Sequence, residues 1–581
     1  MSAQWIEIAV SVFSAMEIGL LAAAGFATAR HRGLPVAEAV AYGTMGSLMA
    51  ASALLQLSML LAPAALGWML EGTAAALAVS VLVADRGRLL QLRGFSLSAR
   101  PSGIVVAVVL AGVYLAAQAL LLPPLAMDHT PLERLVAICA EFGTRQPGGP
   151  LSLAALPPLN SAVLPLMILR FGTEAGIGIF GFAAYLVLGA ATYSLARRYA
   201  WPPTALTVTL VVWSMPRFVL HATSGGFELV PTAAGLVAVL ALYRTVETPN
   251  LGDLAVMLCA ICFSMTDGPY CLVFPLVLTA LATVLLFRRH GWRYCKNSLQ
   301  NNRGGGLVAL PLFFLFSQSW IFAANLSAGY PWAGSLHPTP LAPNAHGILE
   351  AVANACRYLI QMIHLPVGGH FETAFARGLE QIYTGYLGPT IERTIHLAPF
   401  AVNWDLAPRT AWFGPFAVLL SLPALAFALV RAPRRLKALA VAMVGYAYLV
   451  ALTVAWHGSN ARLFSPFFAI SGFVIAFFLP PWRLTRSGKR LLQVAAAAML
   501  IYVALFQTDR PIIGWRHLMP ATRSVWHQDV SGMKRAMAEA VRESVWWKVF
   551  GEHAGRAAEP NPPAGPPVKG SVADTSLMPQ P

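Results

Sequence analysis

The sequence predicts an all-α protein that crosses a lipid bilayer many times, because it is rich in apolar residues, poor in charged residues and organised in long apolar runs. Of its 581 residues, 57% are hydrophobic and only 11% are charged, and lipid is the natural solvent for such a composition. The runs have the length of about 20 residues that a helix needs to cross a hydrocarbon core about 30 Å thick. Ten-residue segments of alternating polarity, typical of membrane barrels, are not seen, so the spans are predicted to be helices.

Apolar runs between basic loops predict a polytopic bundle of about 14 transmembrane helices. We expect them near residues 6–28, 38–61, 67–84, 103–123, 174–196, 203–221, 229–245, 251–265, 268–287, 306–325, 411–430, 438–456, 463–480 and 491–507. Glu7 and Glu17 interrupt the first run, and no basic segment precedes it. A retained helix is therefore favoured over a cleavable signal peptide.

The net charge of +15 is interpreted as a topology signal, and no nucleic-acid partner is expected. Arginines and lysines gather in short loops, as the positive-inside rule predicts for the cytoplasmic side. These basic positions are Arg30 and Arg32, Arg86 to Arg100, Arg197 and Arg198, Arg288 to Arg303, Arg431 to Lys437, and Arg483 to Arg490. An even number of spans then places both termini outside, together with the two long loops at 124–173 and 326–410.

The outer loops are predicted to contain helices at the membrane surface. In the first loop, MDHTPLERLVAICAEFGT favours a short surface helix before a Pro/Gly-rich stretch. In the second loop, amphipathic stretches lie around 346–364 and 371–386. The expected organisation has four parts: extra N-terminal helices at 1–102, a membrane core at 103–507, an outer segment at 508–555 and a disordered tail at 556–581.

Acidic residues gather at the predicted outer ends of spans, while the spans themselves are interpreted as nearly free of ionisable groups. Asp128 and Glu133 follow the fourth span, Glu228 opens the seventh, and Asp267 lies between the eighth and ninth. We expect these residues to converge on one outward-facing cavity. A proton-coupled carrier is disfavoured, because it would need a series of ionisable groups at membrane depth.

Two carboxylates of the first outer loop have a chemical and a structural interpretation. Asp128 directly follows an apolar helix, where a partly desolvated carboxylate can act as a general base toward an acceptor hydroxyl. Asp is also a favoured helix cap, so capping remains an equal alternative. Glu133 lies five residues further on and is either catalytic or part of a solvated helix face.

Arg462 begins a predicted span in WHGSNARLFSP, where its guanidinium can bind a phosphate with two hydrogen bonds. The alternative is an interface anchor that extends toward water. Outer histidines, among them His457, have no metal-ligand spacing. Cys259 and Cys262 form a C-x-x-C inside an apolar run without a second pair, so no zinc site is expected.

Five segments follow one another in an order typical of a known class. They are Asp128 after a membrane helix with LNSAVLPLMILRFG downstream, VVWSMPRFVLHATSGGFELVPTAAGLVAVLALYR with Glu228, AICFSMTDGPYCLVFPLVLTAL with Thr266, Asp267 and Tyr270, NLSAGYPWAGSLHPTP, and NARLFSPFFAI with Arg462 and Pro466. Over about residues 103–507 the chain resembles the GT-C class of membrane glycosyltransferases, especially bacterial members similar to the protein mannosyltransferases and aminoarabinose transferases of glycosyltransferase family 39.

The sequence departs from this family in three places. Leu132-Glu133 stand where the family has Tyr-His after the aspartate, and Asp267 stands where the family has the Lys of a Lys-Tyr segment. In addition, three predicted spans precede the span that is usually the first in the family.

The resemblance implies a transferase at the outer face of the cell inner membrane, with its active site toward the periplasm or exterior. A polyprenyl-phosphate sugar donor would enter from the bilayer, and a lipid, glycan or protein acceptor would displace the lipid phosphate with inversion. Asp128 and Glu133 are the expected catalytic residues, with Asp128 as the base. The expected substrate-binding residues are Glu228, Asp267, Tyr270, His457 and Arg462. A divalent metal remains possible, because members of the class differ in this respect.

Two other functions fit the same features. A transporter or flippase of a lipid-linked glycan would use many spans and a basic outer cavity. Such folds usually contain an internal repeat and broken helices at the midplane. No repeat is evident between the halves, although Gly268-Pro269 interrupts one apolar stretch. A noncatalytic scaffold of an envelope-glycan assembly is the third possibility.

Overall fold

The described part of the chain is helical and contains no strand. The computed structural model describes residues 3–61, 71–77, 79, 103–122, 132–136, 156–171, 174–224, 228–265, 272–301, 303–334, 347–363, 369–388, 400–402, 412–479 and 485–507. These residues belong to one compact unit, Met1–Pro511. The all-α prediction is confirmed for them, whereas the segments predicted at 508–555 and 556–581 lie outside the described residues.

Eight helices in the described residues are long and apolar enough to cross a membrane. They are Ile8–His31 within α1 (Ala3–His31), Val36–Leu60 within α2 (Val36–Leu61), α4 (Gly103–Leu121), α7 (Ile179–Ala196), α10 (Leu229–Glu247), Val273–Gly291 within α12 (Val273–Asn301), α19 (Arg434–Thr453) and α22 (Arg486–Phe506). Each coincides with a predicted span. The expectation of several membrane-spanning helices is therefore confirmed.

Other predicted spans are short or interrupted helices, so the predicted count of about 14 full-length spans is not reached in the described residues. The span predicted at 67–84 lies mostly outside them. The remaining helices are α6 (Leu166–Leu169), α8 (Pro202–Trp213), α9 (Pro216–His221), α11 (Leu251–Phe263), α13 (Arg303–Phe316), α14 (Ser319–Ser327), η4 (Ala417–Ser421), α18 (Leu422–Arg431), η5 (Gly458–Phe464), α20 (Ser465–Gly472) and α21 (Ile475–Phe478).

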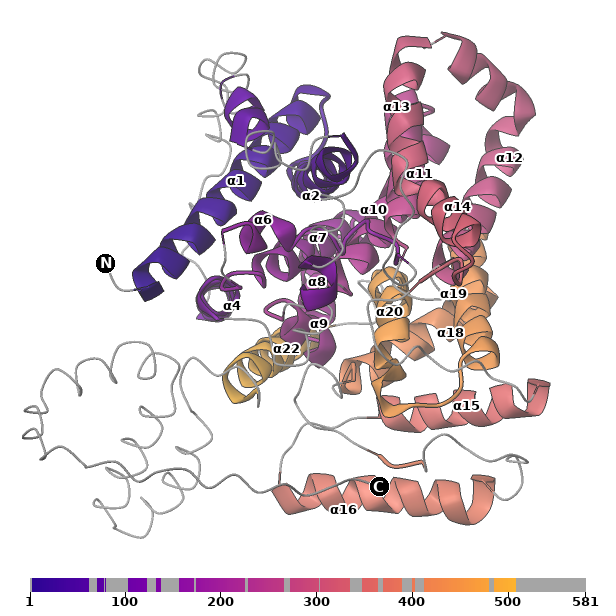
Figure 1. Cartoon of the computed structure of the whole chain (residues 1–581). Helices are drawn as coiled ribbons and strands as arrows, with labels where there is room; N and C mark the ends of the chain where they lie inside the picture. Colours follow the sequence, from indigo (N-terminus) through magenta and orange to yellow (C-terminus); the bar gives the residue numbers. More distant parts are fainter. Residues whose placement is uncertain are drawn as a thin grey trace, which may run out of the picture. The chain divides into compact units, whose positions relative to one another are not determined.

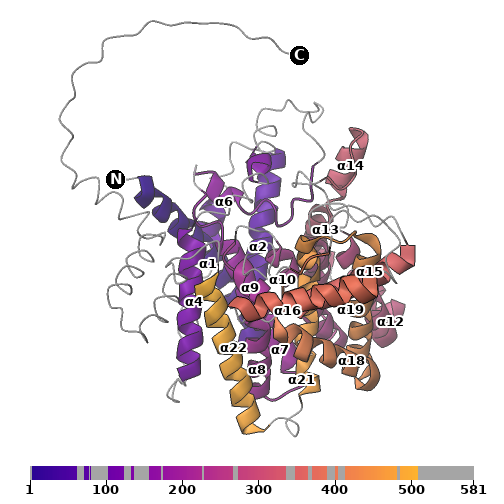
Figure 2. The same cartoon turned by 90° about the horizontal axis from the view of Figure 1, so that it is seen from below.

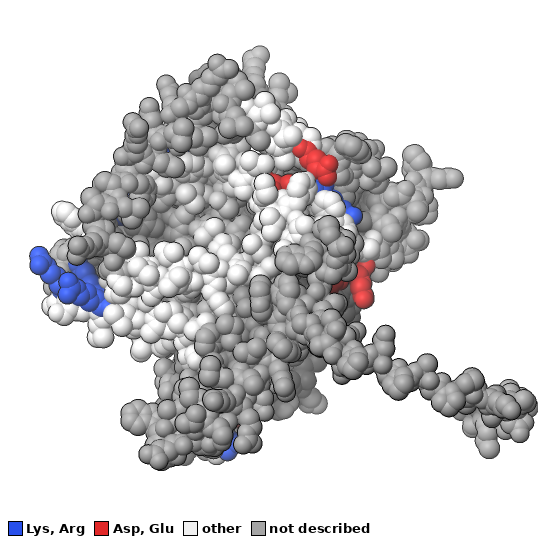
Figure 3. Space-filling model, turned by 90° about the vertical axis from the view of Figure 1, so that its left-hand side faces the viewer, with Lys and Arg blue, Asp and Glu red and all other residues white. Residues whose placement is uncertain are grey.

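Helix α10 forms the centre of the compact unit (Figure 1). It is buried along nearly its whole length and packs against α7, α11, α12 and α20. Helices α4 and α22 pack against each other and lie side by side in both views (Figures 1 and 2). The described surface in Figure 3 is mostly free of charged side chains, as a lipid-facing surface requires.

Helices α1 and α2 approach so closely that their backbones touch. A Cβ atom added to Gly25 would lie 2.8 Å from the Cα of Gly43, and one added to Gly43 would lie 2.4 Å from the backbone nitrogen of Phe26. Small residues at helix crossings permit this close packing in membranes, where burial of apolar surface alone gives little attraction between helices. Glycine is therefore required at both positions.

Buried side-chain amides support irregular backbone beside the apolar helices. Gln318 separates α13 from α14, which are bent by 48°, and it adopts a left-handed conformation with φ 55°. Its Oε1 accepts from the backbone N–H of Leu159 at 2.6 Å, and its Nε2 donates to Asn160 Oδ1 at 2.9 Å and Gln56 Oε1 at 3.0 Å. Asn160 in turn donates to the carbonyls of Cys262 and Phe316. The amides thus bind backbone groups in the irregular segment and at the ends of α11 and α13.

Two amphipathic helices confirm the predicted elements at 346–364 and 371–386. They are α15 (Gly347–Met362) and α16 (Gly369–Ile382), which continues into η3 (Tyr383–Leu387). Helix α15 packs against α19 and runs across it (Figure 1). Asn354 of α15 donates to the carbonyls of Ala451 and Val454, which satisfies acceptors at the C-terminal end of α19.

We expect Gln318→Ala to lower the free energy of unfolding by about 2–3 kcal/mol, because a buried backbone N–H and two amide partners lose their hydrogen bonds. Gln381→Ala on the exposed face of α16 is the matched control and should change stability by less than about 0.5 kcal/mol. Unfolding in detergent, followed by tryptophan fluorescence, measures both. Equal stabilities would contradict the supporting role of Gln318.

Candidate functional site

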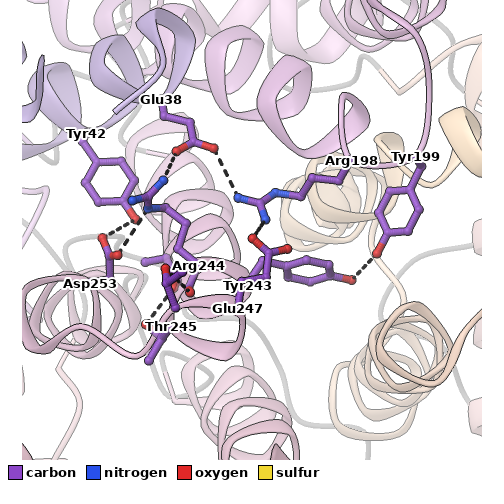
Figure 4. A network of polar contacts seen from close by, with 11 residues as sticks. Glu38, Tyr42, Arg198, Tyr199, Tyr243, Arg244, Thr245, Glu247 and Asp253 are labelled. Carbon is purple, nitrogen blue, oxygen red and sulfur yellow. Dashed lines mark hydrogen bonds and ion pairs between the residues drawn. The ribbon is translucent and has the colours of Figure 1, made fainter. Parts of the chain in front are cut away.

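Charged side chains form two clusters at opposite ends of α10. The first, here called the Glu228 cluster, contains Arg217, His221, Glu228 and Arg462. The second, the Glu38 network, joins α2, α7, α10 and α11 through Glu38, Arg198, Arg244, Glu247 and Asp253 (Figure 4). A helix of 19 residues is about 28 Å long, so the two clusters are separated by about the thickness of a hydrocarbon core.

The Glu228 cluster is built around a buried arginine. The side chain of Arg217 is only 1% exposed, and its Nη2 donates to Glu228 Oε2 at 2.6 Å. Its Nε donates to Ser465 Oγ at 3.2 Å. His221 Nε2 lies 3.5 Å from the same Glu228 oxygen, and its Nδ1 lies 3.3 Å from Ser224 Oγ. Two elements distant in sequence, α9 and α20, are thereby linked through one guanidinium.

Local sequence explains why Arg217 lies inside the bundle. Pro216 begins α9 at a favoured first-turn position, and Met215 before it is extended, as a residue preceding proline prefers. The backbone N–H of Arg217, in the first turn of α9, donates to the carbonyl of Trp412. Gly181 allows α7 to approach this segment, since a Cβ there would lie 2.5 Å from the carbonyl oxygen of His221.

Arg462 adds a second guanidinium to the cluster. It lies in η5, three residues before Ser465, and is half-buried. Its charge acts on both Glu228 and Arg217. Within the described part of the chain its side chain makes no hydrogen bond or ion pair, whereas Arg217 is paired with Glu228. The two arginines thus exceed the single carboxylate by one positive charge.

The Glu228 carboxylate is 29% exposed and permanently ionised at ordinary pH. Burial acts to raise its pKa, but the charges of Arg217, His221 and Arg462 outweigh burial and lower the pKa from 4.5 to about 2. A carboxylate with so low a pKa is a weak base. Glu228 is therefore better suited to orienting Arg217 and offsetting positive charge in the cluster. It is poorly suited to proton transfer.

An aromatic layer packs beside the cluster. Phe218 contacts Phe413, and Phe464 contacts Tyr358 with ring centroids 4.7 Å apart. Trp412 and Trp456 stack at 6.5 Å, and both are buried. These rings fix the backbone on either side of Arg217 and Arg462 and exclude water from one side of the cluster, which strengthens its electrostatic interactions.

The structure brings together only part of the predicted site. Glu228 and Arg462, two of the expected substrate-binding residues, lie in one cluster, whereas the expected convergence of the acidic residues stays a prediction. Asp128, Asp267 and Tyr270 lie outside the described residues. Glu133 is exposed on a short helix at 132–136, and His457 is exposed beside η5, where its carbonyl accepts from the N–H of Asn460. No contact among the described residues joins Glu133 or His457 to Glu228.

The expectation that the spans are nearly free of ionisable groups is wrong. Glu17, Glu38, Arg217 and Asp253 lie within predicted spans and are buried. They are retained because each has an oppositely charged partner, as buried charges require. The partners are Arg170 for Glu17, Arg198 and Arg244 for Glu38, Glu228 for Arg217, and Arg244 for Asp253.

Sequence reasoning missed Arg217, His221 and Ser465 as members of the site. The signal for Arg217 was its place inside the predicted span 203–221, because an arginine at membrane depth indicates a functional site or a buried partner. His221 lies one helical turn further on, on the same face of α9. Ser465 had no comparable signal, since a serine after Phe464 is an ordinary residue at a helix start.

The described residues provide no metal centre. No three His, Cys, Asp or Glu side chains among them are grouped so that they could hold a metal ion. Cys259 and Cys262 are buried in α11 as free thiols. The described residues therefore contain no ligand set for the divalent metal that the resemblance allows.

We expect Glu228→Gln to destabilise the protein by about 3 kcal/mol, because Arg217 would remain buried without a counter-charge. Arg217→Met combined with Glu228→Gln should recover most of this loss. Glu133→Gln, which changes an exposed glutamate, is the matched control. Unfolding of each variant in detergent provides the double-mutant cycle, and additive effects of the two substitutions would contradict the ion pair.

The low pKa of Glu228 predicts a carboxylate that stays charged in mild acid. Stability from this pair is fully present above the unfolded-state pKa near 4.3 and is lost only as pH falls through about 2. An infrared difference spectrum between wild type and Glu228→Gln at pH 4 should show the carboxylate bands alone. A carboxylic acid carbonyl band at this pH would show that the pKa is not lowered.

Comparisons of the chain with models of known protein families, with curated proteins and with solved structures found no match. The functional interpretation therefore depends on the chemistry of the chain itself.

Proposed function

We propose that this protein is a membrane glycosyltransferase that moves a sugar from a polyprenyl-phosphate donor to an acceptor at the outer face of the inner membrane. The observation that supports this most strongly is the half-buried guanidinium of Arg462 beside the Arg217–Glu228 pair, for which the described residues provide no hydrogen-bond or ion-pair partner. An arginine without a carboxylate in a partly dry site is suited to a phosphate. A lipid phosphate would supply the negative charge that the Glu228 cluster lacks.

The position of the Glu228 cluster supports a lipid-linked donor. The cluster lies at one end of α10, where a phosphate at the membrane surface would meet it while the polyprenyl chain stays among apolar helices. The basic residues Arg30, Arg197 and Arg198 lie at helix ends on the opposite side, at the Glu38 network. Under the positive-inside rule that side is cytoplasmic, and the Glu228 cluster then faces outward.

The proposed reaction has one displacement. Asp128 accepts the proton of an acceptor hydroxyl, whose oxygen attacks the anomeric carbon. The bond between this carbon and the phosphate oxygen breaks, and polyprenyl phosphate leaves with the electron pair. Arg462 offsets the charge that develops on the leaving phosphate, and Glu228 keeps Arg217 from competing for that phosphate. The proposed function includes membership of the GT-C class, which the sequence resemblance implies.

A specific observation favours a transporter or flippase as the second candidate. Helices α13 and α14 are long and apolar enough to cross a membrane only if they form one span, and they are bent by 48° relative to each other. The irregular segment at 156–165 contacts the bend, because Leu159 and Asn160 hydrogen-bond to Gln318. Transporters often bind substrates at interrupted helices. The interruption here is filled by saturated amides, however, so it supports a structural role equally well.

Arg462→Gln is expected to weaken binding of a polyprenyl-phosphate sugar by about tenfold or more, because a charge-assisted hydrogen bond to the phosphate is lost. Asp128→Asn should retain binding and lose release of polyprenyl phosphate. Both quantities are measured on purified protein in detergent with a panel of polyprenyl-phosphate sugars. One assay measures binding of the donor, and a second measures release of polyprenyl phosphate. Arg431→Gln, at the end of α18, is the control with the same change of charge.

The same experiment separates the candidates. A transferase releases polyprenyl phosphate from wild type and not from Asp128→Asn. A flippase moves the intact donor across a reconstituted bilayer and leaves its sugar attached. A scaffold does neither, and a panel in which no donor binds, or in which both variants match wild type, would overturn the proposed transferase.

A further inference from the structure

A cavity of about 310 Å³ lies near the Glu38 network, away from the Glu228 cluster. It opens between α1 and α2 and extends to the turn that joins α10 to α11. Its apolar lining includes Leu21, Ala24, Ala29, Leu34, Ala50 and Leu77, and its polar lining includes Thr28, Arg32, Tyr42, Arg244, Asn250 and Asp253. The volume falls at the lower end of the range for small-molecule sites. A lining that is apolar in one part and charged in another suits an amphiphile.

The charges around the cavity are not equally available. Arg244 is paired with two carboxylates, because its Nη1 lies 2.5 Å from Glu38 Oε2 and its Nε lies 3.2 Å from Asp253 Oδ2. Asp253 also accepts from the Tyr42 hydroxyl at 3.3 Å (Figure 4). Arg32 is exposed, and within the described residues its side chain has no hydrogen bond or ion pair. Among the charged side chains that line the cavity, Arg32 is therefore the guanidinium that no carboxylate of the described residues pairs with.

Two glycines shape the apolar part. Gly25 and Gly46 both line the cavity. A Cβ atom added to Gly46 would meet nothing within 4 Å, so the space beside α2 is open at this point. Arg32 lies at the other end, where its Nη1 is 2.9 Å from the place that a Cβ of Gly252 would occupy. The guanidinium thus lies at the turn before α11, and the open apolar space continues along α2.

We propose that this cavity binds an anionic phospholipid, with the phosphodiester on Arg32 and part of an acyl chain beside Gly46. Basic pockets between membrane helices on the cytoplasmic side are suited to anionic headgroups. The phosphodiester accepts hydrogen bonds from the guanidinium, and the acyl chain continues from the cavity along the apolar surface of α1 and α2. The bound lipid would join α1 and α2 to the α10–α11 turn.

Lipid binding is tested with full-length, delipidated protein in detergent by native mass spectrometry. Phosphatidylglycerol and phosphatidylcholine of equal chain length are titrated separately. Arg32→Gln should weaken phosphatidylglycerol binding about fivefold and phosphatidylcholine binding less, because the choline cation already offsets the phosphodiester charge in phosphatidylcholine. Gly46→Leu, whose side chain enters the cavity, should abolish the preference for phosphatidylglycerol.

Matched controls identify the site. Arg486→Gln removes an exposed arginine at the start of α22, and Gly19→Leu adds the same side chain at a position on α1 with nothing within 4 Å of its Cβ. Neither residue lines the cavity, so both variants should bind as wild type does. Arg462→Gln should also leave this preference intact, because it changes the other end of the bundle.

Three outcomes would overturn the proposal. Equal binding of the two lipids by wild type would exclude recognition of the anionic headgroup. Loss of preference in Arg462→Gln but not in Arg32→Gln would place the lipid at the Glu228 cluster. Displacement of phosphatidylglycerol by an equal concentration of glycerol 3-phosphate would show that a soluble phosphate ester, and not a lipid, is the ligand.

Discussion

Polar groups buried among apolar helices must bind one another, and the described structure depends on this constraint. Glu17, Glu38, Arg217 and Asp253 are each paired with an opposite charge. The amides of Asn160 and Gln318 satisfy backbone groups of irregular segments. Where no water is present, a buried polar group without a hydrogen-bond partner lowers the stability of the fold by several kcal/mol. The polar contacts therefore fix which helices are neighbours and where helices can end.

Arg462 differs from these paired charges, because within the described residues its half-buried side chain has no hydrogen bond or ion pair. The other arginines of the two α10 clusters, Arg198, Arg217 and Arg244, each form an ion pair with a carboxylate. Arg462 lies beside such a pair without joining it, and its partly buried position makes an incoming anion favourable. In the Glu38 network each arginine is paired with a carboxylate, whereas the described residues of the Glu228 cluster include two arginines and one carboxylate, a charge balance suited to a phosphate ligand.

Sequence patterns predicted the helical membrane class and most long helices, because a span is a local property of about 20 apolar residues. They also indicated Glu228 and Arg462 as site residues. The short and bent helices were not predicted: Met215-Pro216 divides one apolar run, and Gln318 in a left-handed conformation divides another. The buried ion pair of Arg217 was missed because Arg217 lies inside the predicted span 203–221, whereas its partner Glu228 was placed at the start of the next predicted span. Contacts of this kind depend on packing between distant segments, which periodicity does not encode.

The central claim is that Arg462 binds the phosphate of a lipid-linked donor. The most direct test is an experimental structure of the full chain with a polyprenyl-phosphate sugar bound. The account predicts the phosphate within hydrogen-bond distance of the Arg462 guanidinium, with the Arg217–Glu228 pair still formed beside it. A donor phosphate bound at another place, or an Arg462 side chain paired with a carboxylate of this chain, would contradict the account.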